Sequence, residues 1–257
     1  LLDMHRHTEA GEKFRRVLEL EADQPDAHFL LGELAEIEGR IPDALVHYDV
    51  VLRLDKTYSR VRLRLARVLF ARGRDEDLPR IRDLLKQEHR TFRADIDVDS
   101  SVHLSSTIIA ERCEDLEELG RLMLDAEMET EAVKVYTAMI ELQPTSHRAH
   151  HGLSVALLQS GNYELGIVAA KKALDSQPRF VPAMHNLALA YLRQQQWIRA
   201  RYWVRQASRV EPDDPSLRRL RVKLRAHAVL GTVLMVAKKM GAVFAPIRWF
   251  LARPSRG

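Results

Sequence analysis

Four histidines of this sequence are spaced so that their imidazoles could meet on one surface. His147, His150 and His151 stand at i, i+3 and i+4 of an expected helix, and His185 follows His151 by 34 residues. Three or four imidazoles that converge can hold Zn²⁺, and a histidine cluster can make a binding surface sensitive to pH. A histidine on a solvated or packed helix face is the commoner case, so we predict no metal site.

A second pattern that could do chemistry is the alternating run of Asp95, Asp97 and Asp99. Alternating carboxylates begin a calcium loop, but Ser100 stands where that loop needs glycine and Ser106 where it needs a bidentate glutamate. An exposed acidic linker therefore fits the run better. The sequence holds no nucleophile motif and no glycine-rich phosphate loop. It predicts neither an enzyme nor a bound cofactor.

The elements that position these residues repeat every 34 residues. In residues 147–180, Leu153 falls on the apolar stripe of a first helix, Gly161 supplies a turn, and Ala173 lies on the stripe of a second helix that Pro178 ends. Two helices per period indicate units that bury their apolar faces only by stacking on their neighbours. The equivalent residues one period later are Leu187, Gln195, Ala207 and Pro212, and those one period earlier are Leu119, Glu127, Met139 and Pro144.

These residues resemble the tetratricopeptide repeat, whose pattern has leucine at position 7, glycine or alanine at 8, an aromatic residue near 24, alanine at 27 and proline at 32. The resemblance implies an all-α fold: a right-handed α-solenoid of stacked helix-turn-helix repeats, with a C-terminal capping helix and a basic, apolar extension. The ranges that it implies are a half repeat at 1–24, repeats at 25–58 and 59–92, an inserted segment at 93–112, repeats at 113–146, 147–180 and 181–214, a capping helix at 215–225 and the extension at 226–257.

The inserted segment predicts two lobes, residues 1–92 and 113–214. Residues 93–99 have the wrong pattern for a helix, and Ser100 or Ser101 could cap a helix that runs into the next repeat. The repeat at 59–92 has Arg82 in place of the aromatic residue, which makes it the least regular unit.

In the family, the first helix of each repeat lines a concave groove. The resemblance therefore implies a surface that holds an extended or helical segment of one or more partner proteins. A carboxylate clamp of the kind found in chaperone adaptors is not expected, because His151 and Val155 replace the lysine and asparagine that it requires. The implied groove residues are Phe29, Glu33, Arg60, Leu63, Arg67, Phe70, Glu117, Arg121, Arg148, His151, Val155, His185, Leu189 and Arg193.

Charge is segregated along the chain. The net charge is +4, but no acidic residue follows Asp214, so 30 basic and 36 acidic residues give the first 214 residues a charge of about −6. A basic, partly apolar tail suits an anionic membrane surface, a membrane-protein complex or another larger assembly. The acidic body disfavours nucleic acid. The docking residues that we expect are Arg218, Arg221, Arg225, Lys238, Lys239, Phe244, Arg248, Trp249 and Phe250.

Two alternatives remain open: an architectural subunit without a free groove ligand, and a regulatory or substrate-presenting domain of a larger enzyme. The single cysteine, Cys113, indicates a reducing compartment, hence the cytoplasm or its membrane periphery. A periplasmic location stays open, because the sequence begins in mid-repeat and a targeting segment could precede residue 1.

Overall fold

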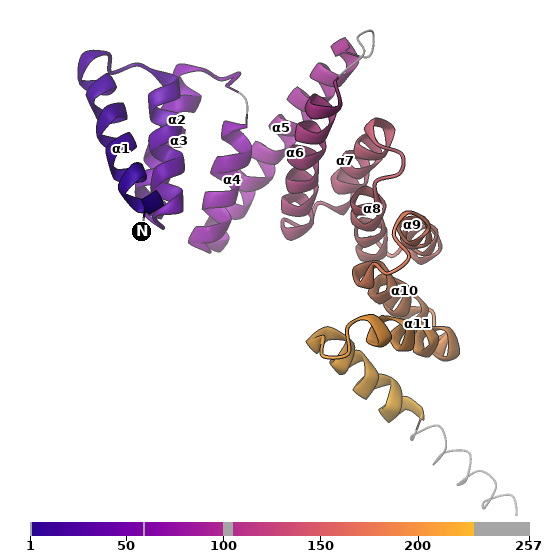
Figure 1. Ribbon diagram of the computed structural model, residues 1–257. Coiled ribbons are helices and arrows are strands. Elements are labelled where there is room, and N and C mark those ends of the chain that lie inside the picture. Colours follow the sequence, from indigo (N-terminus) through magenta and orange to yellow (C-terminus); the bar gives the residue numbers. More distant parts are fainter. Residues whose placement is uncertain (1, 59, 100–104, 229–257) are drawn as a thin grey trace, which may run out of the picture. The chain divides into compact units, whose positions relative to one another are not determined.

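The computed structural model describes residues 2–58, 60–99 and 105–228, and it describes side chains from residue 8 onward except those of residues 93–99 (Figure 1). Every regular element within these ranges is a helix, which confirms the all-α class. The helices are α1 (Leu2–Leu20), α2 (Pro25–Ile37), α3 (Ile41–Leu54), α4 (Val61–Arg72), the 3₁₀ turn η1 (Asp75–Asp77), α5 (Leu78–Asp99), α6 (Ser106–Asp125), α7 (Glu129–Leu142), α8 (His147–Gln159), α9 (Tyr163–Ser176), α10 (Val181–Arg193), α11 (Trp197–Val210) and a C-terminal helix over 215–228.

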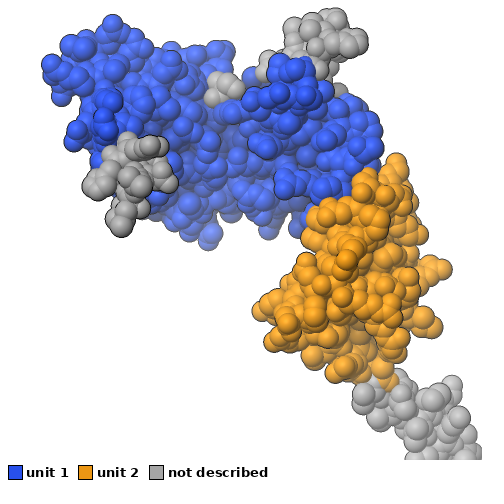
Figure 2. Space-filling model, viewed as in Figure 1, with its two compact units in different colours: residues 1–161 blue, residues 162–257 orange. Residues whose placement is uncertain are grey.

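The chain divides into two compact units, residues 1–161 and 162–257 (Figure 2). The boundary falls in the turn between α8 and α9, inside the repeat at 147–180. This division differs from the two lobes that the sequence predicts, whose boundary is the segment 93–112.

In unit 1, consecutive helices pack against each other from α1 to α8. One continuous apolar core runs through the unit, from Ala35 of α2 to Ala156 of α8. Helix starts follow the expected chemistry: Pro25 opens α2, and the Ser146 hydroxyl accepts a hydrogen bond from the Ala149 amide at the start of α8 (3.3 Å). The periodic apolar residues thus form the core that stacking requires.

The aromatic residue of the repeat pattern packs on bare backbone. A Cβ atom at Gly32 would lie 2.6 Å from the Tyr48 ring, and one at Gly120 would lie 2.7 Å from the Tyr136 ring. Gly152 of α8 approaches the other side of the Tyr136 ring still more closely. Tyr136 of α7 therefore sets the spacing of both α6 and α8.

The segment that follows the second full repeat is helical, contrary to the sequence-based expectation. Helix α5 continues to Asp99, so the prediction of non-helical residues 93–99 was wrong. No glycine or proline interrupts this stretch, and nothing else in it ends a helix. The cap of α6 is Ser105, whose hydroxyl accepts from the Ile108 amide, whereas Ser100 and Ser101 lie outside the described residues.

Arg82 takes over part of the role of the missing aromatic residue in the repeat at 59–92. Its Nε atom donates a hydrogen bond to the carbonyl oxygen of Ala126, 2.8 Å away, in the turn that follows α6. A polar contact to backbone thus replaces ring packing at this position.

Unit 2 contains α9, α10, α11 and the C-terminal helix. Asp214 begins the C-terminal helix, because its Oδ1 atom accepts from the Leu217 amide at 2.8 Å. Leu217 is fully buried in a cluster with Val181, Met184 and Ala207. The C-terminal helix is therefore packed into unit 2.

The spacing role of Tyr136 predicts that Gly152→Ala destabilises the protein by about 1–3 kcal/mol, because the added methyl group overlaps the ring. The matched control is Gly11→Ala in α1, where an added Cβ meets Leu34 at an ordinary 3.6 Å; this change should stabilise the protein by about 0.5–1 kcal/mol. Urea unfolding followed by circular dichroism measures both effects. Equal stability of the two variants would contradict the role given to Tyr136.

Candidate functional site

Charged residues on the first helices of unit 1 are joined by ion pairs that cross from repeat to repeat. We call this set the ion-pair ladder. Its central member is Arg67 of α4, which lies 2.5 Å from Glu36 of α2 and 3.1 Å from Glu118 of α6. The other pairs are Glu33–Arg64 at 3.0 Å, Arg60–Asp115 at 2.8 Å and Glu117–Arg148 at 3.2 Å.

Partial burial strengthens the centre of the ladder. The side chains of Arg67, Glu36 and Glu118 are 31%, 16% and 25% exposed. Burial opposes the charge of Arg67, but the two carboxylates outweigh it and raise the pKa of the guanidinium. The Tyr48 hydroxyl also donates to Glu36, at 3.0 Å. The predicted groove residues Glu33, Arg60, Arg67, Glu117 and Arg148 thus already bind one another.

The apolar residues predicted for the groove in unit 1 lie mostly in or beside the core. Leu63 is only 2% exposed, so its placement in an open groove was wrong: it belongs to the apolar core, where stacking covers it. Phe29 and Phe70 are half-buried against the same core. The Phe29 ring lies 5.1 Å from that of Tyr58, whose hydroxyl donates to Asp26.

The remaining predicted residues of unit 1 are more accessible. Arg121 is exposed and pairs with Asp125, one turn along the same helix, at 3.1 Å. His151 and Val155 of α8 are half-buried. Arg148 is 61% exposed, so a partner can reach it as well as these three side chains.

In unit 2, two predicted residues line a pocket of about 250 Å³. His185 and Leu189 of α10 face Arg219 and Lys223 of the C-terminal helix across it, with Ser216 and Leu220 completing the lining. Burial lowers the pKa of His185, and Asp214 partly offsets this effect. Arg193 is exposed and lies outside the lining. The basic C-terminal helix was noted in the sequence, but its place beside α10 was not foreseen.

Comparison with known families decides the identity of the repeats. Tetratricopeptide repeat models match residues 1–59 and residues 157–224. The chain is a tetratricopeptide repeat protein.

Solved structures of other tetratricopeptide repeat proteins share this fold at low sequence identity. YrrB, described as having an unusual peptide-binding site, is 15% identical with a TM-score of 0.62, over 82% of this chain and 98% of its own. PilF of Pseudomonas aeruginosa is 14% identical with a TM-score of 0.54, over 86% and 92%. MamA is 18% identical with a TM-score of 0.54, over 73% and 92%. None of the curated protein sequences matches the chain.

The histidine and aspartate residues that the sequence analysis considered as metal ligands lie in surroundings that do not form a metal site. His150 is buried, and its Nε2 atom lies 2.9 Å from the carbonyl oxygen of Pro144. Asp95, Asp97 and Asp99 lie on helix α5, so they form no calcium loop. Within the ranges that the structure describes, no three His, Cys, Asp or Glu side chains gather as metal ligands would.

The predicted docking residues fall into two groups. Arg218 and Arg225 are exposed on the C-terminal helix, and Arg221 is half-exposed there. Lys238, Lys239, Phe244, Arg248, Trp249 and Phe250 lie outside the described residues. Among the described helices, none combines the length and the apolar character that crossing a bilayer requires.

The ladder predicts unequal costs for removing two arginines of the same surface. Arg67→Met should destabilise the protein by about 1–3 kcal/mol, because Glu36 and Glu118 then stay partly buried without their cation. Arg121→Met should cost less than about 0.5 kcal/mol, since its pair with Asp125 is exposed. Thermal unfolding of both variants tests this, and equal costs would show that the ladder adds nothing to stability.

Proposed function

We propose that the protein is an interaction scaffold that holds a segment of a partner protein against the first helices of its repeats. The observation that carries the proposal is the pocket in unit 2, where His185 and Leu189 from the predicted groove meet Arg219 and Lys223. The half-buried Leu189 offers apolar surface, and the two cations offer charge. This combination suits a peptide with an apolar side chain next to a carboxylate.

For the ion-pair ladder in unit 1 we propose a role other than binding a partner. Its arginines are already neutralised by the protein's own carboxylates, so a partner gains little by pairing with them. We therefore assign the ladder to holding the repeats together.

A Leu189→Asp substitution should abolish capture of the partner while leaving the helical content unchanged, because it places a carboxylate in the apolar part of the pocket. Leu165→Asp is the matched control, since this leucine of α9 is 59% exposed and lies outside the pocket. Pull-down with the full chain, read by mass spectrometry, measures the proteins retained. The proposal fails if Leu189→Asp retains the same proteins as the unchanged chain.

We further propose that the C-terminal extension docks the scaffold on an anionic membrane surface or on a larger assembly. The supporting observation is that all ten charges beyond Asp214 are positive, interleaved with apolar residues that include Trp249 and Phe250. Of the docking residues that the sequence predicts, Arg221 and Arg225 line a cleft of unit 2, so we assign docking to the others. They are Arg218, Lys238, Lys239, Phe244, Arg248, Trp249 and Phe250.

For this proposal, the intact chain should sediment with phosphatidylserine-containing liposomes, and a chain ending at Ala228 should lose most of that binding. Ending at Ala228 keeps Leu217, Leu220 and Leu224, which are buried in unit 2, whereas ending at Asp214 would remove them. Neutral liposomes are the control for charge. Equal sedimentation of the two chains would rule out lipid binding by the extension.

A further inference from the structure

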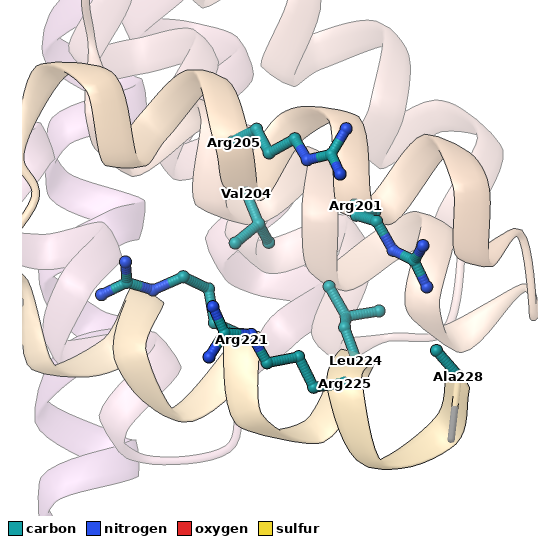
Figure 3. Close-up of a pocket in the computed structure, with 7 residues that line it drawn as sticks. All are labelled: Arg201, Val204, Arg205, Arg221, Leu224, Arg225 and Ala228. Carbon is teal, nitrogen blue, oxygen red and sulfur yellow. The ribbon is translucent and has the colours of Figure 1, made fainter. Parts of the chain in front are cut away.

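A second cleft in unit 2 lies between α11 and the C-terminal helix, with a volume of about 410 Å³ (Figure 3). It uses none of the residues that line the pocket at His185. A stacked pair of rings connects the two helices, Trp197 at the start of α11 and His227 of the C-terminal helix, whose centroids are 3.4 Å apart. The lining residues are Arg201, Val204, Arg205, Arg221, Leu224, Arg225 and Ala228.

Arginines form the two walls of this cleft, as Figure 3 shows. Arg201 and Arg205 lie one turn apart on α11, and Arg221 and Arg225 lie one turn apart on the opposite helix. Four residues of helix advance about 6 Å. Each wall therefore carries two arginines whose Cα atoms lie about one turn apart, and their long side chains can reach carboxylates that are spaced one turn apart on a peptide.

The cations of this cleft differ from those of the ladder because they face no carboxylate. In the part of the chain that the structure describes, Arg201, Arg205 and Arg225 take part in no ion pair or hydrogen bond. Arg221 donates only to the carbonyl oxygen of Pro212, at 3.2 Å. Helix α11 and residues 215–228 contain nine basic residues and no acidic one. Like charges held together without counter-charges raise the free energy of the unbound state, and an anionic ligand relieves that repulsion.

The floor of the cleft is apolar. Val204 and Leu224 are only 2% and 3% exposed, and Figure 3 shows them between the two arginine walls. Because so little of these two side chains is exposed, a ligand meets only their edges, together with the methylene stems of the arginines on either side. An apolar group of the ligand can pack on those stems, while its negative charge reaches the guanidinium groups.

We propose that this cleft binds an acidic segment of a partner protein, in which an apolar side chain is flanked by carboxylates. Guanidinium groups bind carboxylates through two parallel hydrogen bonds, and the apolar side chain packs on the methylene stems of the arginines above Val204 and Leu224. A phosphodiester strand has no apolar group for the floor, and it binds without sequence preference by stacking its bases on aromatic rings. The nearby Trp197 ring is already stacked on His227. A flat bilayer surface contacts charges on an exposed face more easily than it contacts charges arranged around the floor of a cleft.

The test is fluorescence anisotropy with the full chain and a labelled peptide in which leucines alternate with pairs of glutamates. The unchanged protein should bind this peptide and should bind a glutamine-for-glutamate version at least about tenfold more weakly. The double variant Arg201→Glu and Arg225→Glu should also lose about tenfold or more in affinity. The matched control Arg179→Glu and Arg209→Glu changes the charge of unit 2 equally at two exposed positions outside the cleft, and it should lose less than about threefold.

Circular dichroism and the thermal midpoint report whether each variant folds. If the glutamate variant does not fold, Arg201→Gln with Arg225→Gln removes the charges without reversing them and should weaken binding in the same direction. Equal binding of the two peptides, or equal losses in the cleft and control variants, would overturn the proposal. It would also be overturned if phosphatidylserine vesicles or single-stranded DNA bound more tightly than the peptide and lost that binding only in the cleft variant.

Discussion

The fit of an aromatic ring against glycine backbone is the contact on which the stacking in unit 1 depends. Tyr136 touches Gly120 on one side and Gly152 on the other, so one ring fixes the distances from α7 to both α6 and α8. The Tyr48 ring of α3 packs in the same way on Gly32 of α2, and it fixes the distance between these two helices. Because each helix pair buries its apolar face only on its neighbours, an error in this spacing would pass along the stack. Where Arg82 replaces the ring, a hydrogen bond to backbone holds the next turn instead.

The two units use their arginines in opposite ways. In unit 1, Arg60, Arg64 and Arg67 reach across to carboxylates of a neighbouring repeat, so charge contributes to cohesion. In unit 2, the arginines of α11 and of the C-terminal helix face each other without carboxylates between them. An arginine that is paired with a carboxylate of the same fold gains little by binding a further anion. A cluster of arginines without carboxylates still attracts an anionic ligand. This contrast favours α11 and the C-terminal helix, rather than the predicted groove in unit 1, as the surface for an anionic partner.

Sequence reasoning succeeded where residues at fixed spacing have only one way to pack. The positions of Gly32, Tyr48, Gly120 and Tyr136 in the 34-residue period follow from the contact that they make.

Sequence reasoning failed where the partner of a residue comes from another repeat. Leu63 occupies a groove position in the family pattern, yet it is buried, because the neighbouring helices cover it. Residues 93–99 were expected not to be helical, but helix α5 runs through them to Asp99, and they contain no glycine or proline that would interrupt it.

The sequence by itself determined the helical class, the repeat length, the helix pairs and the gathering of positive charge after Asp214, since these depend on spacing along the chain. Only the tertiary structure decided which charges neutralise each other and which line a cleft. The arginine at 67 and the arginine at 201 look alike in the sequence, but Arg67 meets Glu36 and Glu118, which are 31 and 51 residues away. Arg201 lines a cleft together with the arginines of a following helix. Distances between side chains that are far apart in sequence arise from the packing of helices, and no local pattern encodes them.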